Sequence, residues 1–516
     1  MSEIELKVVL DDAGEAHLRA RLEDVRQGGP ALRRQSLRTV YHDTPDHRLR
    51  KAGTALRLRL EGETWTQTVK ARAGIAGGLM RTEEVDAPAP DGLLDLNRIP
   101  VPEIREEILA AVDGAELLPV CETRMERTSC VLRSEGGARV ELAIDCGEIL
   151  AGDRRAPFRE AELELLQGDV SALYDLAGRL FPEGGLRLST LPKSARGYLL
   201  AETGEIGPKL APRKAREVPL APEMTAEIAA RDVLRECFEQ ITANIDVVLH
   251  SPAPEGPHQL RIGLRRLRAA MGLFRPVIGH PEMARLGAQA KALGAAVGAL
   301  RDLDVVIADV IDPSERDHAS EPGFAILREA VEARRDTTRE TLRRHLEGAE
   351  VQGFQIALAR FIEARGWLVP SDIDQTTRLA APVGELAERA LGKRWKSVRK
   401  HAHGIDHLTI EARHELRKEL KKLRYSVEFM GPLYKEKAVA EFVKRMKRLQ
   451  TVFGELNDLA MAEEMLCGID SPGARNLAAQ RAVGWILGNR GAHAELSWTH
   501  AKELWQDLKG KGPFWA

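Results

Sequence analysis

Cysteine and aromatic residues are scarce in this sequence, and their scarcity excludes several kinds of protein. Only 5 of the 516 residues are cysteines, and none of them stands in a Cys-x-x-Cys spacing. A zinc site, a redox motif and a disulfide-bonded scaffold are therefore not predicted. Aromatic residues make up 4% of the chain, and none alternates regularly with basic residues. Binding of nucleic acid by base stacking is therefore disfavoured.

The sequence also lacks a long apolar run, a secretory signal and a substantial net charge. We therefore expect a soluble, reduced, cytoplasmic protein with no membrane partner. The net charge of -2 results from 76 basic and 78 acidic residues, so recognition of a polyanion would need local clusters of cations. The sequence contains no G-x-x-x-x-G-K-[ST] phosphate loop and no serine nucleophile elbow, which disfavours other hydrolase mechanisms.

The first strand that the sequence predicts carries its charges on one face. From Glu3 to Val8, charged and apolar residues alternate with the two-residue period of a β-strand. Glu3, Glu5 and Lys7 share one face, on which neighbouring side chains lie roughly 7 Å apart. Two carboxylates at that spacing can share a hard cation, and an ammonium beside them can hold an anion. A face in contact with water is the alternative interpretation for this strand alone.

The same alternation returns in later strands, with charges of both signs. The cations that we expect to bind phosphate together with Lys7 are Arg57, Arg59, Lys70, Arg81, Arg127, Lys193 and Arg196. The carboxylates that we expect as metal ligands are Glu3, Glu5, Asp145, Glu162 and Glu164. A sheet curled into a barrel would enclose these charges in a polar interior, while helices cover the apolar outside. Buried ion pairs without any ligand are the alternative.

Several motifs in residues 1 to about 203 together resemble the CYTH family of triphosphate tunnel metalloenzymes. They are the opening Glu-x-Glu-x-Lys, Tyr-His-Asp-Thr at 41–44, Leu-Arg-Leu-Arg at 56–59, Gln-Thr-Val-Lys at 67–70, Glu-x-Glu-x-Glu at 160–164 and Lys-Ser-Ala-Arg-Gly at 193–197. The resemblance implies an α+β domain built on an antiparallel eight-stranded β-barrel tunnel with flanking helices. It also implies divalent-metal-dependent hydrolysis of a triphosphate or, in some members, cyclisation of ATP. His42 departs from the phenylalanine that is commoner in the family.

The charges of such a tunnel predict how it would act on its substrate. A triphosphate carries about four negative charges, so its terminal phosphoryl group resists attack until cations neutralise it. The basic residues would hold the phosphate chain, and Mg²⁺ or Mn²⁺ bound by the carboxylates would bridge phosphate oxygens and activate water. Glu5 and Lys7 are the candidate catalytic residues. The sequence leaves open which group acts as the base.

A second domain of helical pattern follows a short linker. Residues 204–222 are rich in Gly, Pro, Lys and Arg, whereas residues 223–516 form long segments rich in Ala, Leu, Arg and Glu. At an offset of 156 residues, the region around His258 matches the region around His414. We therefore predict a C-terminal all-α domain of two repeated helical bundles over residues 223–516, after a tunnel domain over residues 1–203.

Each copy of this repeat carries a stripe of basic residues along one helical face. The two stripes are His258, Arg261, Arg265 and Arg268, and His414, Arg417, Lys421 and Arg424. A solvated helix face is the alternative, but no acidic residue interrupts either stripe. The pattern resembles the CHAD family of α-helical domains, whose members bind inorganic polyphosphate. The resemblance implies that these eight residues bind polyphosphate.

Two classes of function fit these observations. The first is an inorganic triphosphatase with an appended polyphosphate-binding domain, for which polyphosphate granules are a candidate site of association. The second is a non-catalytic protein that only binds polyphosphate or nucleic acid. The complete set of charged strands favours the enzyme. Hydrolysis of thiamine triphosphate or cyclisation of ATP would need a pocket for an organic group, which the sequence does not identify.

Overall fold

The computed structural model describes residues 2–26, 31–76, 78–189, 191–207, 209–468 and 470–515. The chain divides into two compact units. The barrel unit comprises Met1–Leu210 and Glu347–Gly366, and the helical unit comprises Ala211–Leu346 and Trp367–Ala516. One segment from the C-terminal half of the sequence therefore belongs to the barrel unit.

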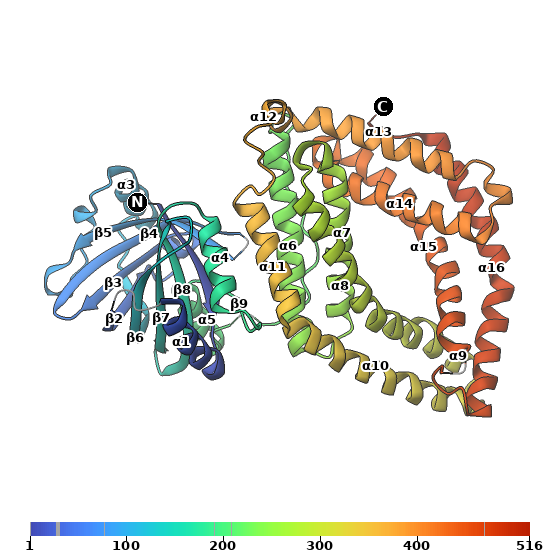
Figure 1. Cartoon of the computed structure of the whole chain (residues 1–516), viewed down its shortest axis with the longest axis horizontal. Helices are drawn as coiled ribbons and strands as arrows, with labels where there is room; N and C mark the ends of the chain where they lie inside the picture. Colours follow the sequence, from blue (N-terminus) through green and yellow to red (C-terminus); the bar gives the residue numbers. More distant parts are fainter. Residues whose placement is uncertain are drawn as a thin grey trace. The chain divides into compact units, whose positions relative to one another are not determined.

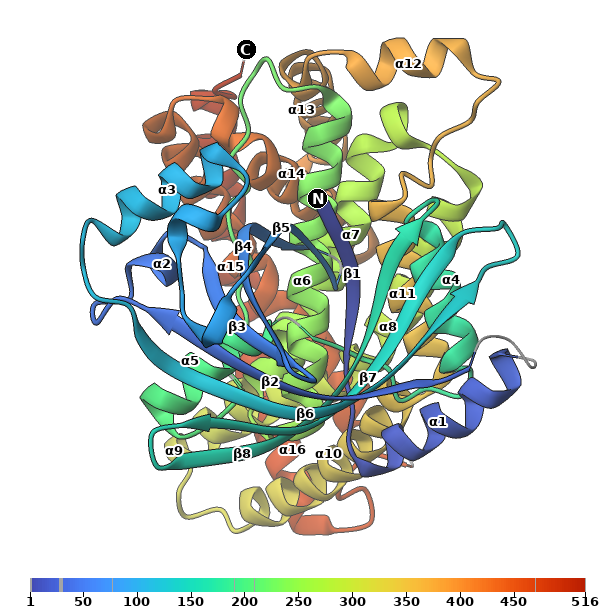
Figure 2. The ribbon, with the colours of Figure 1, turned by 90° about the vertical axis from the view of Figure 1, so that its left-hand side faces the viewer.

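A closed antiparallel sheet forms the barrel unit (Figure 2). Its strands are β1 (Ser2–Val9), β2 (Arg33–Asp43), β3 (Ala55–Glu61), β4 (Thr64–Ala76), β5 (Leu79–Pro88), β6 (Leu118–Arg133), β7 (Arg139–Ala151) and β8 (Arg154–Gln167). They follow the order β5-β4-β3-β2-β6-β7-β8-β1, and β1 also pairs with β5, which closes the barrel. The two-residue strand β9 (Arg187–Leu188) pairs with the end of β1. The expected eight-stranded antiparallel barrel is therefore confirmed.

The barrel strands present apolar side chains outward, and helices cover them. The α-helices of the barrel unit are α1 (Asp12–Arg26), α2 (Arg48–Lys51), α3 (Pro102–Val112), α4 (Ser171–Leu180), α5 (Lys193–Thr203) and α11 (Ala349–Glu363). Val69 of β4 and Val85 of β5, for example, are buried in one cluster with Ile104 and Ile108 of α3. Because successive strand residues point to opposite faces, this outward packing directs the intervening polar residues into the barrel.

The secondary-structure elements that the structure describes in the helical unit are all helices (Figure 1). The α-helices are α6 (Ala226–His250), α7 (Glu255–Ile278), α8 (Pro281–Val305), α9 (Asp312–Asp317), α10 (Gly323–Glu347), α12 (Ile373–Ala380), α13 (Val383–His401), α14 (Ile410–Met430), α15 (Glu436–Leu466) and α16 (Leu477–Lys511). The expected all-α character is confirmed. Helices α7 and α8 recur as α14 and α15, each beginning 155 residues later. In the part of the chain that the structure describes, no helix is long and apolar enough to cross a membrane.

Candidate active site

A polar cavity of about 730 Å³ lies inside the barrel and is lined by side chains from all eight strands and from α5. The predicted site residues that line it are Glu3, Lys7, Arg57, Arg59, Lys70, Arg127, Glu162, Glu164 and Lys193. Glu5, Asp145, Arg81 and Arg196 are not among the described residues that line it. The alternation of charged and apolar residues along the strands thus brings most of the predicted residues to one place.

Three glutamates form a row across neighbouring strands β1, β8 and β7. Glu5 pairs in register with Glu164, which pairs in turn with Glu141. One oxygen of Glu5 lies 3.1 Å from Nζ of Lys7, whereas its Oε1 is buried and has no hydrogen-bond partner within the described ranges. Burial, with repulsion from Glu5 and Glu141, raises the pKa of Glu164. Lys7 pairs with Glu5 alone in this row, and Glu164 and Glu141 form no ion pair within the described ranges, so the row keeps negative charge that a hard divalent cation would neutralise.

Glu141 was not among the predicted site residues. It shares a strand face with Asp145, and this was visible in the sequence. What the sequence did not show is the register that places Glu141 opposite Glu164, because strand pairing depends on residues far apart in the chain.

A second acidic group already holds a cation that belongs to the protein. Asp145, Glu160 and Glu162 each offer a carboxylate oxygen within 4.8 Å of the others. Nζ of Lys193 lies 2.7 Å from Asp145 and 2.9 Å from Glu162, and it also contacts Glu160. Burial opposes the charge on Lys193, but these three carboxylates raise its pKa. Arg127 forms further ion pairs with Asp145 and Glu162, so the negative charge of this group is compensated.

Glu3 and Glu84 form a carboxyl pair between β1 and β5. Nζ of Lys70 lies 2.6 Å from Glu3 and 2.8 Å from Glu84, and Arg57 lies 2.9 Å from Glu84. Burial raises the pKa of Glu3 to about 7, and its hydrogen bond with Glu84 adds to this shift. Burial opposes ionisation of Glu84 as well, but Arg57 and Lys70 hold its pKa below the usual value. Near neutral pH, Glu3 is therefore about half protonated, and a bound cation would displace its proton.

Arg59 is the cavity's least compensated cation. Its Nε donates a hydrogen bond of 3.3 Å to the hydroxyl of Thr39, and no carboxylate in the described part of the chain forms an ion pair with it. Burial, with repulsion from Arg57 and Arg127, lowers the pKa of Arg59 to about 10. A buried guanidinium without a local carboxylate favours an anionic ligand.

Arg81 and Arg196 have partners away from the cavity lining. Arg81 pairs across the strands with Ile4, and its guanidinium lies 3.2 Å from Glu363. The residue next to it on β5, Thr82, lines the cavity instead, so Arg81 is on the outer face. Arg196 donates a hydrogen bond to the hydroxyl of Ser189 and lies 3.3 Å from Glu160. Arg81 is therefore apart from the other predicted phosphate ligands, whereas Arg196 shares the carboxylate of Glu160 with Lys193 but does not line the cavity.

The two basic stripes of the helical unit approach one another, because α7 and α14 are in contact. Burial, with repulsion from Arg261 and Arg417, lowers the pKa of Arg265 to about 10. Burial, with repulsion from Arg417, Arg265 and Arg261, lowers the pKa of Lys421 to about 7. We call these four residues the basic patch: Arg261, Arg265, Arg417 and Lys421. Its positive charges repel one another, which a polyanion would relieve.

The remaining stripe residues surround this patch to different degrees. Burial and then Arg301 lower the pKa of His258, so this imidazole lies near further positive charge. Arg424 forms a hydrogen bond with Gln450 and an ion pair with Glu428. Arg268 is exposed, and His414 is partly buried.

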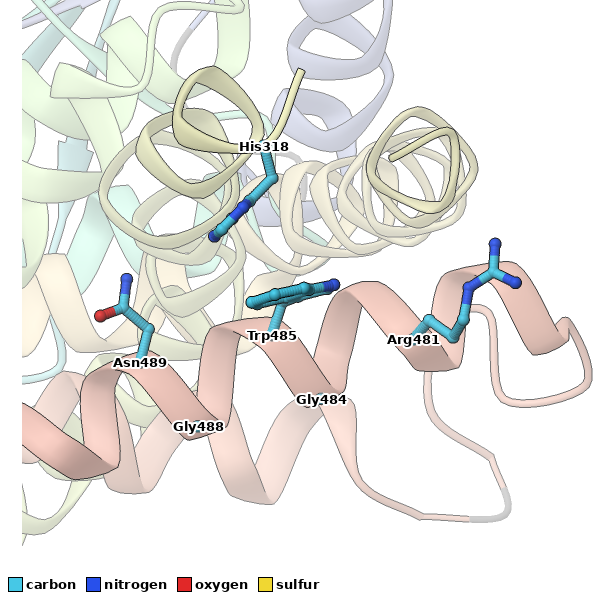
Figure 3. Close-up of a pocket in the computed structure, with 6 residues that line it drawn as sticks. All are labelled: His318, Arg481, Gly484, Trp485, Gly488 and Asn489. Carbon is cyan, nitrogen blue, oxygen red and sulfur yellow. The ribbon is translucent and has the colours of Figure 1, made fainter. Parts of the chain in front are cut away.

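A cavity of about 630 Å³ in the helical unit has a different character (Figure 3). It is lined by His318, Arg481, Gly484, Trp485, Gly488 and Asn489. The rings of His318 and Trp485 lie against each other with centroids 4.4 Å apart, and Arg481 forms an ion pair with Glu321. No carboxylate lines this cavity among the described residues, so it lacks the chemistry found in the barrel.

Known proteins resemble both parts of the chain. A model of the CYTH domain matches residues 1–198, and a model of the CHAD domain matches residues 232–467. The inorganic triphosphatase of Haemophilus influenzae is 30% identical over 174 residues, which cover 32% of this chain and 46% of that protein. The match therefore spans about half the length of that relative.

Two further relatives match more than half of the chain. A protein of Mycobacterium tuberculosis described as uncharacterised is 27% identical over 454 residues, which cover 84% of this chain and 82% of that protein. The crystal structure of the CHAD domain from the plant Ricinus communis is 24% identical, with a TM-score of 0.50, and the match covers 58% of this chain and 96% of that chain. This likeness shows the fold alone. The chain thus combines a CYTH domain with a CHAD domain, in that order.

Proposed function

We propose that the barrel hydrolyses inorganic triphosphate to diphosphate and phosphate with Mg²⁺ or Mn²⁺, and that the helical unit binds inorganic polyphosphate. The CYTH match and the relative named an inorganic triphosphatase support triphosphate hydrolysis. The observation that carries the proposal is that one barrel interior holds both a cation without an ion pair among the described residues, Arg59, and carboxylates whose charge is only partly compensated, at Glu5 and Glu164. An oligophosphate bridged by a divalent cation would satisfy both.

The carboxylates of the row fit a divalent cation. Glu5 offers a buried oxygen without a hydrogen-bond partner among the described residues, and Glu164 and Glu141 offer oxygens beside it. Glu3 becomes a ligand once its proton has left. Oxygen donors are the ligands that Mg²⁺ and Mn²⁺ prefer. When bound, such a cation would neutralise phosphate charge and polarise water.

Asp145 and Glu162 were also predicted as metal ligands, and we assign them a supporting role. Their charges are compensated by Lys193 and Arg127, so they hold these two cations in place at the cavity wall. Both cations line the cavity and are positioned to neutralise a phosphate chain.

Lys7 acts as a cation and not as a base. Burial opposes its charge, but Glu162 and Glu5 raise its pKa well above the ordinary value. The ammonium is therefore charged at neutral pH and can donate hydrogen bonds to a phosphate oxygen. Arg57, Arg59 and Lys70 would hold the rest of the phosphate chain, where they stabilise the charge that shifts during phosphoryl transfer.

The test is phosphate release by the full chain from inorganic triphosphate, ATP, thiamine triphosphate and long polyphosphate, with Mg²⁺, Mn²⁺ or a chelator. We expect triphosphate to be the preferred substrate and the chelator to abolish release. Arg59→Ala should raise KM for triphosphate at least tenfold, whereas Arg38→Ala, which removes an exposed guanidinium paired with Glu122, should not. A wild-type chain that releases no phosphate from triphosphate with either metal would refute the proposal.

The basic patch supports polyphosphate binding by the helical unit. Burial and the neighbouring patch arginines lower the pKa values of Arg265 and Lys421, and a linear polyanion with a charge at every phosphate would relieve this repulsion. The described cysteines are all free, as expected for the reduced, cytoplasmic protein that we propose.

A further inference from the structure

Helix α11 (Ala349–Glu363) lies between the two helical repeats in the sequence, yet it packs against the barrel. It contacts α4 (Figure 1), and both helices bury apolar side chains, including Phe354 and Leu358 of α11 and Leu173 of α4. The chain enters α11 directly from the end of α10. A segment outside residues 1–203 therefore completes the barrel unit.

Both polar atoms of the Gln352 side chain on α11 form hydrogen bonds with the loop between α4 and β9. It is 5% exposed. Its Nε2 donates to the carbonyl of Phe181 at 2.5 Å, and its Oε1 accepts from the amide of Leu186 at 2.6 Å. Both of these loop residues are buried. Gln352 thus satisfies two backbone groups of the loop that cannot reach water.

The backbones of the loop and of the α11 segment also meet directly. Gly184 forms a β-bridge with Gly348. A Cβ on Gly184 would lie 2.6 Å from the carbonyl oxygen of Glu347, and the φ of this glycine is +111°. Only glycine permits this approach and this conformation. The loop is therefore held to α11 by main chain as well as by Gln352.

The loop leads straight into contacts with the strand that carries Glu5 and Lys7. β9 begins at Arg187, the residue after Leu186, and pairs with Val8 and Val9 of β1. The amide of Ser189 donates to the carbonyl of Lys7 at 2.8 Å. β9 has only two residues, and so short a strand depends on neighbouring contacts for its position. The contacts of Gln352 thus fix the loop that holds the end of β1.

The far end of α11 reaches the other strand on the same side of β1. Glu363 is 3% exposed, and its Oε2 lies 3.2 Å from the guanidinium of Arg81 on β5. Arg81 pairs in register with Ile4 of β1. One helix therefore holds both strands, β9 and β5, that pair with this edge of β1.

We propose that α11 is a positioning element of the triphosphatase, in which Gln352 holds β9 against β1 and thereby keeps Lys7 in place for the phosphate chain. This inference rests on the proposed hydrolysis of triphosphate. Gln352 touches no reacting atom and acts only through the loop, β9 and the main chain of Lys7.

The test compares full-length Gln352→Leu, which keeps the volume but loses both hydrogen bonds, with Arg360→Ala. Arg360 lies on the same helix and forms an exposed ion pair with Asp175 of α4, so it is a matched control. We expect Gln352→Leu to lower kcat for triphosphate at least tenfold and to speed amide exchange at Ser189. Polyphosphate binding by the same protein should be unchanged, which shows that its helical unit is folded. Arg360→Ala should keep wild-type kcat and exchange.

Two results would overturn this inference. One is a Gln352→Leu protein whose Ser189 amide exchanges faster while kcat stays within twofold of wild type; the other is unchanged exchange. Should Gln352→Leu not fold, Glu363→Gln gives the second test, with a several-fold loss of kcat expected and an unchanged kcat contradicting the proposal. If the wild-type protein releases no phosphate, the proposed function fails by itself, and exchange at Ser189 still decides whether Gln352 holds β9.

Discussion

At the scale of single residues, Glu5 is the carboxylate of the barrel interior that most needs a further ligand. Its buried Oε1 lacks a hydrogen-bond partner among the described residues. The ionised form of its neighbour Glu164 is disfavoured by burial and by repulsion from Glu5 and Glu141, which raise the pKa of Glu164. Glu5→Gln keeps the size of the side chain but removes the charge. We expect turnover of triphosphate to fall by about a hundredfold, the size of effect seen when a stabiliser of transition-state charge is removed.

Glu126→Gln is the control for this change, because Glu126 is an exposed glutamate on β6. It should turn over triphosphate at the wild-type rate. A folded Glu5→Gln protein with wild-type turnover and wild-type metal dependence would remove Glu5 from the proposed cation site.

The Glu3 carboxyl predicts how metal affinity depends on pH. Its pKa is raised to about 7, first by burial and then by its hydrogen bond with Glu84. The cation requires the ionised form, so protons compete with it below pH 7, and metal affinity should rise roughly tenfold per pH unit up to about 7 and then level off. Calorimetric titration with Mn²⁺ from pH 5.5 to 8.5 measures this. Glu3→Gln should flatten the profile, and an equally steep profile in that variant would contradict the assignment.

Lys421 predicts the opposite pH dependence for polyphosphate. Burial and the neighbouring arginines lower its pKa to about 7, so above pH 7 it is mostly neutral in the free protein. A bound polyanion favours the charged form, and binding must then take up a proton. Affinity should therefore fall as pH rises above 7. Lys421→Arg stays charged, so it should lose this part of the pH dependence; a wild-type slope in Lys421→Arg would argue against a role for Lys421.

At the scale of elements, α7 and α14 each supply two residues of the basic patch. A polyanion that spans both helices releases counterions along both, so the plot of log affinity against log salt should be steep. Replacing Arg261 and Arg265 by Ala should reduce the magnitude of this slope by about half. Arg285→Ala removes an exposed cation of α8 that pairs with Glu282 and serves as the control. Equal slopes for all three proteins would place the polyphosphate elsewhere.

The strands illustrate what a two-residue pattern can and cannot predict. On β1 the charged residues alternate with Ile4, Leu6 and Val8, so the pattern separates a charged face from an apolar face. On β5 both faces carry charge, since Arg81 and Glu83 alternate with Thr82 and Glu84. The pattern then does not reveal which set faces the interior. The pairing of β5 with β1 determines that Thr82 and Glu84 do.

At the scale of the whole molecule, the proposed triphosphatase and the proposed polyphosphate site use separate sets of residues. The whole basic patch belongs to the helical unit, and every residue that lines the barrel cavity falls between Glu3 and Tyr198 in the barrel unit. Replacing all four basic residues by Ala in the full chain should abolish polyphosphate binding and leave kcat and KM for triphosphate unchanged. Binding is measured against polyphosphate, RNA and DNA at matched charge.

Two outcomes of that experiment would require revision. Equal or tighter binding of nucleic acid by the wild-type protein would support a nucleic-acid function for the basic patch. A quadruple variant with strongly altered triphosphate turnover would show that the basic patch contributes to the barrel's reaction.

The sequence by itself determined the order of the two domains, the closed barrel and most of the charged residues that line its cavity. It could do so because strand and helix periodicities are local properties, and because each motif occupies a short stretch of chain. Only the tertiary structure decided which charges compensate one another. Lys193 lies among Asp145, Glu160 and Glu162, and α11 joins the barrel unit across the intervening chain. These contacts join residues far apart in sequence, so they depend on strand register and helix packing that no local pattern encodes.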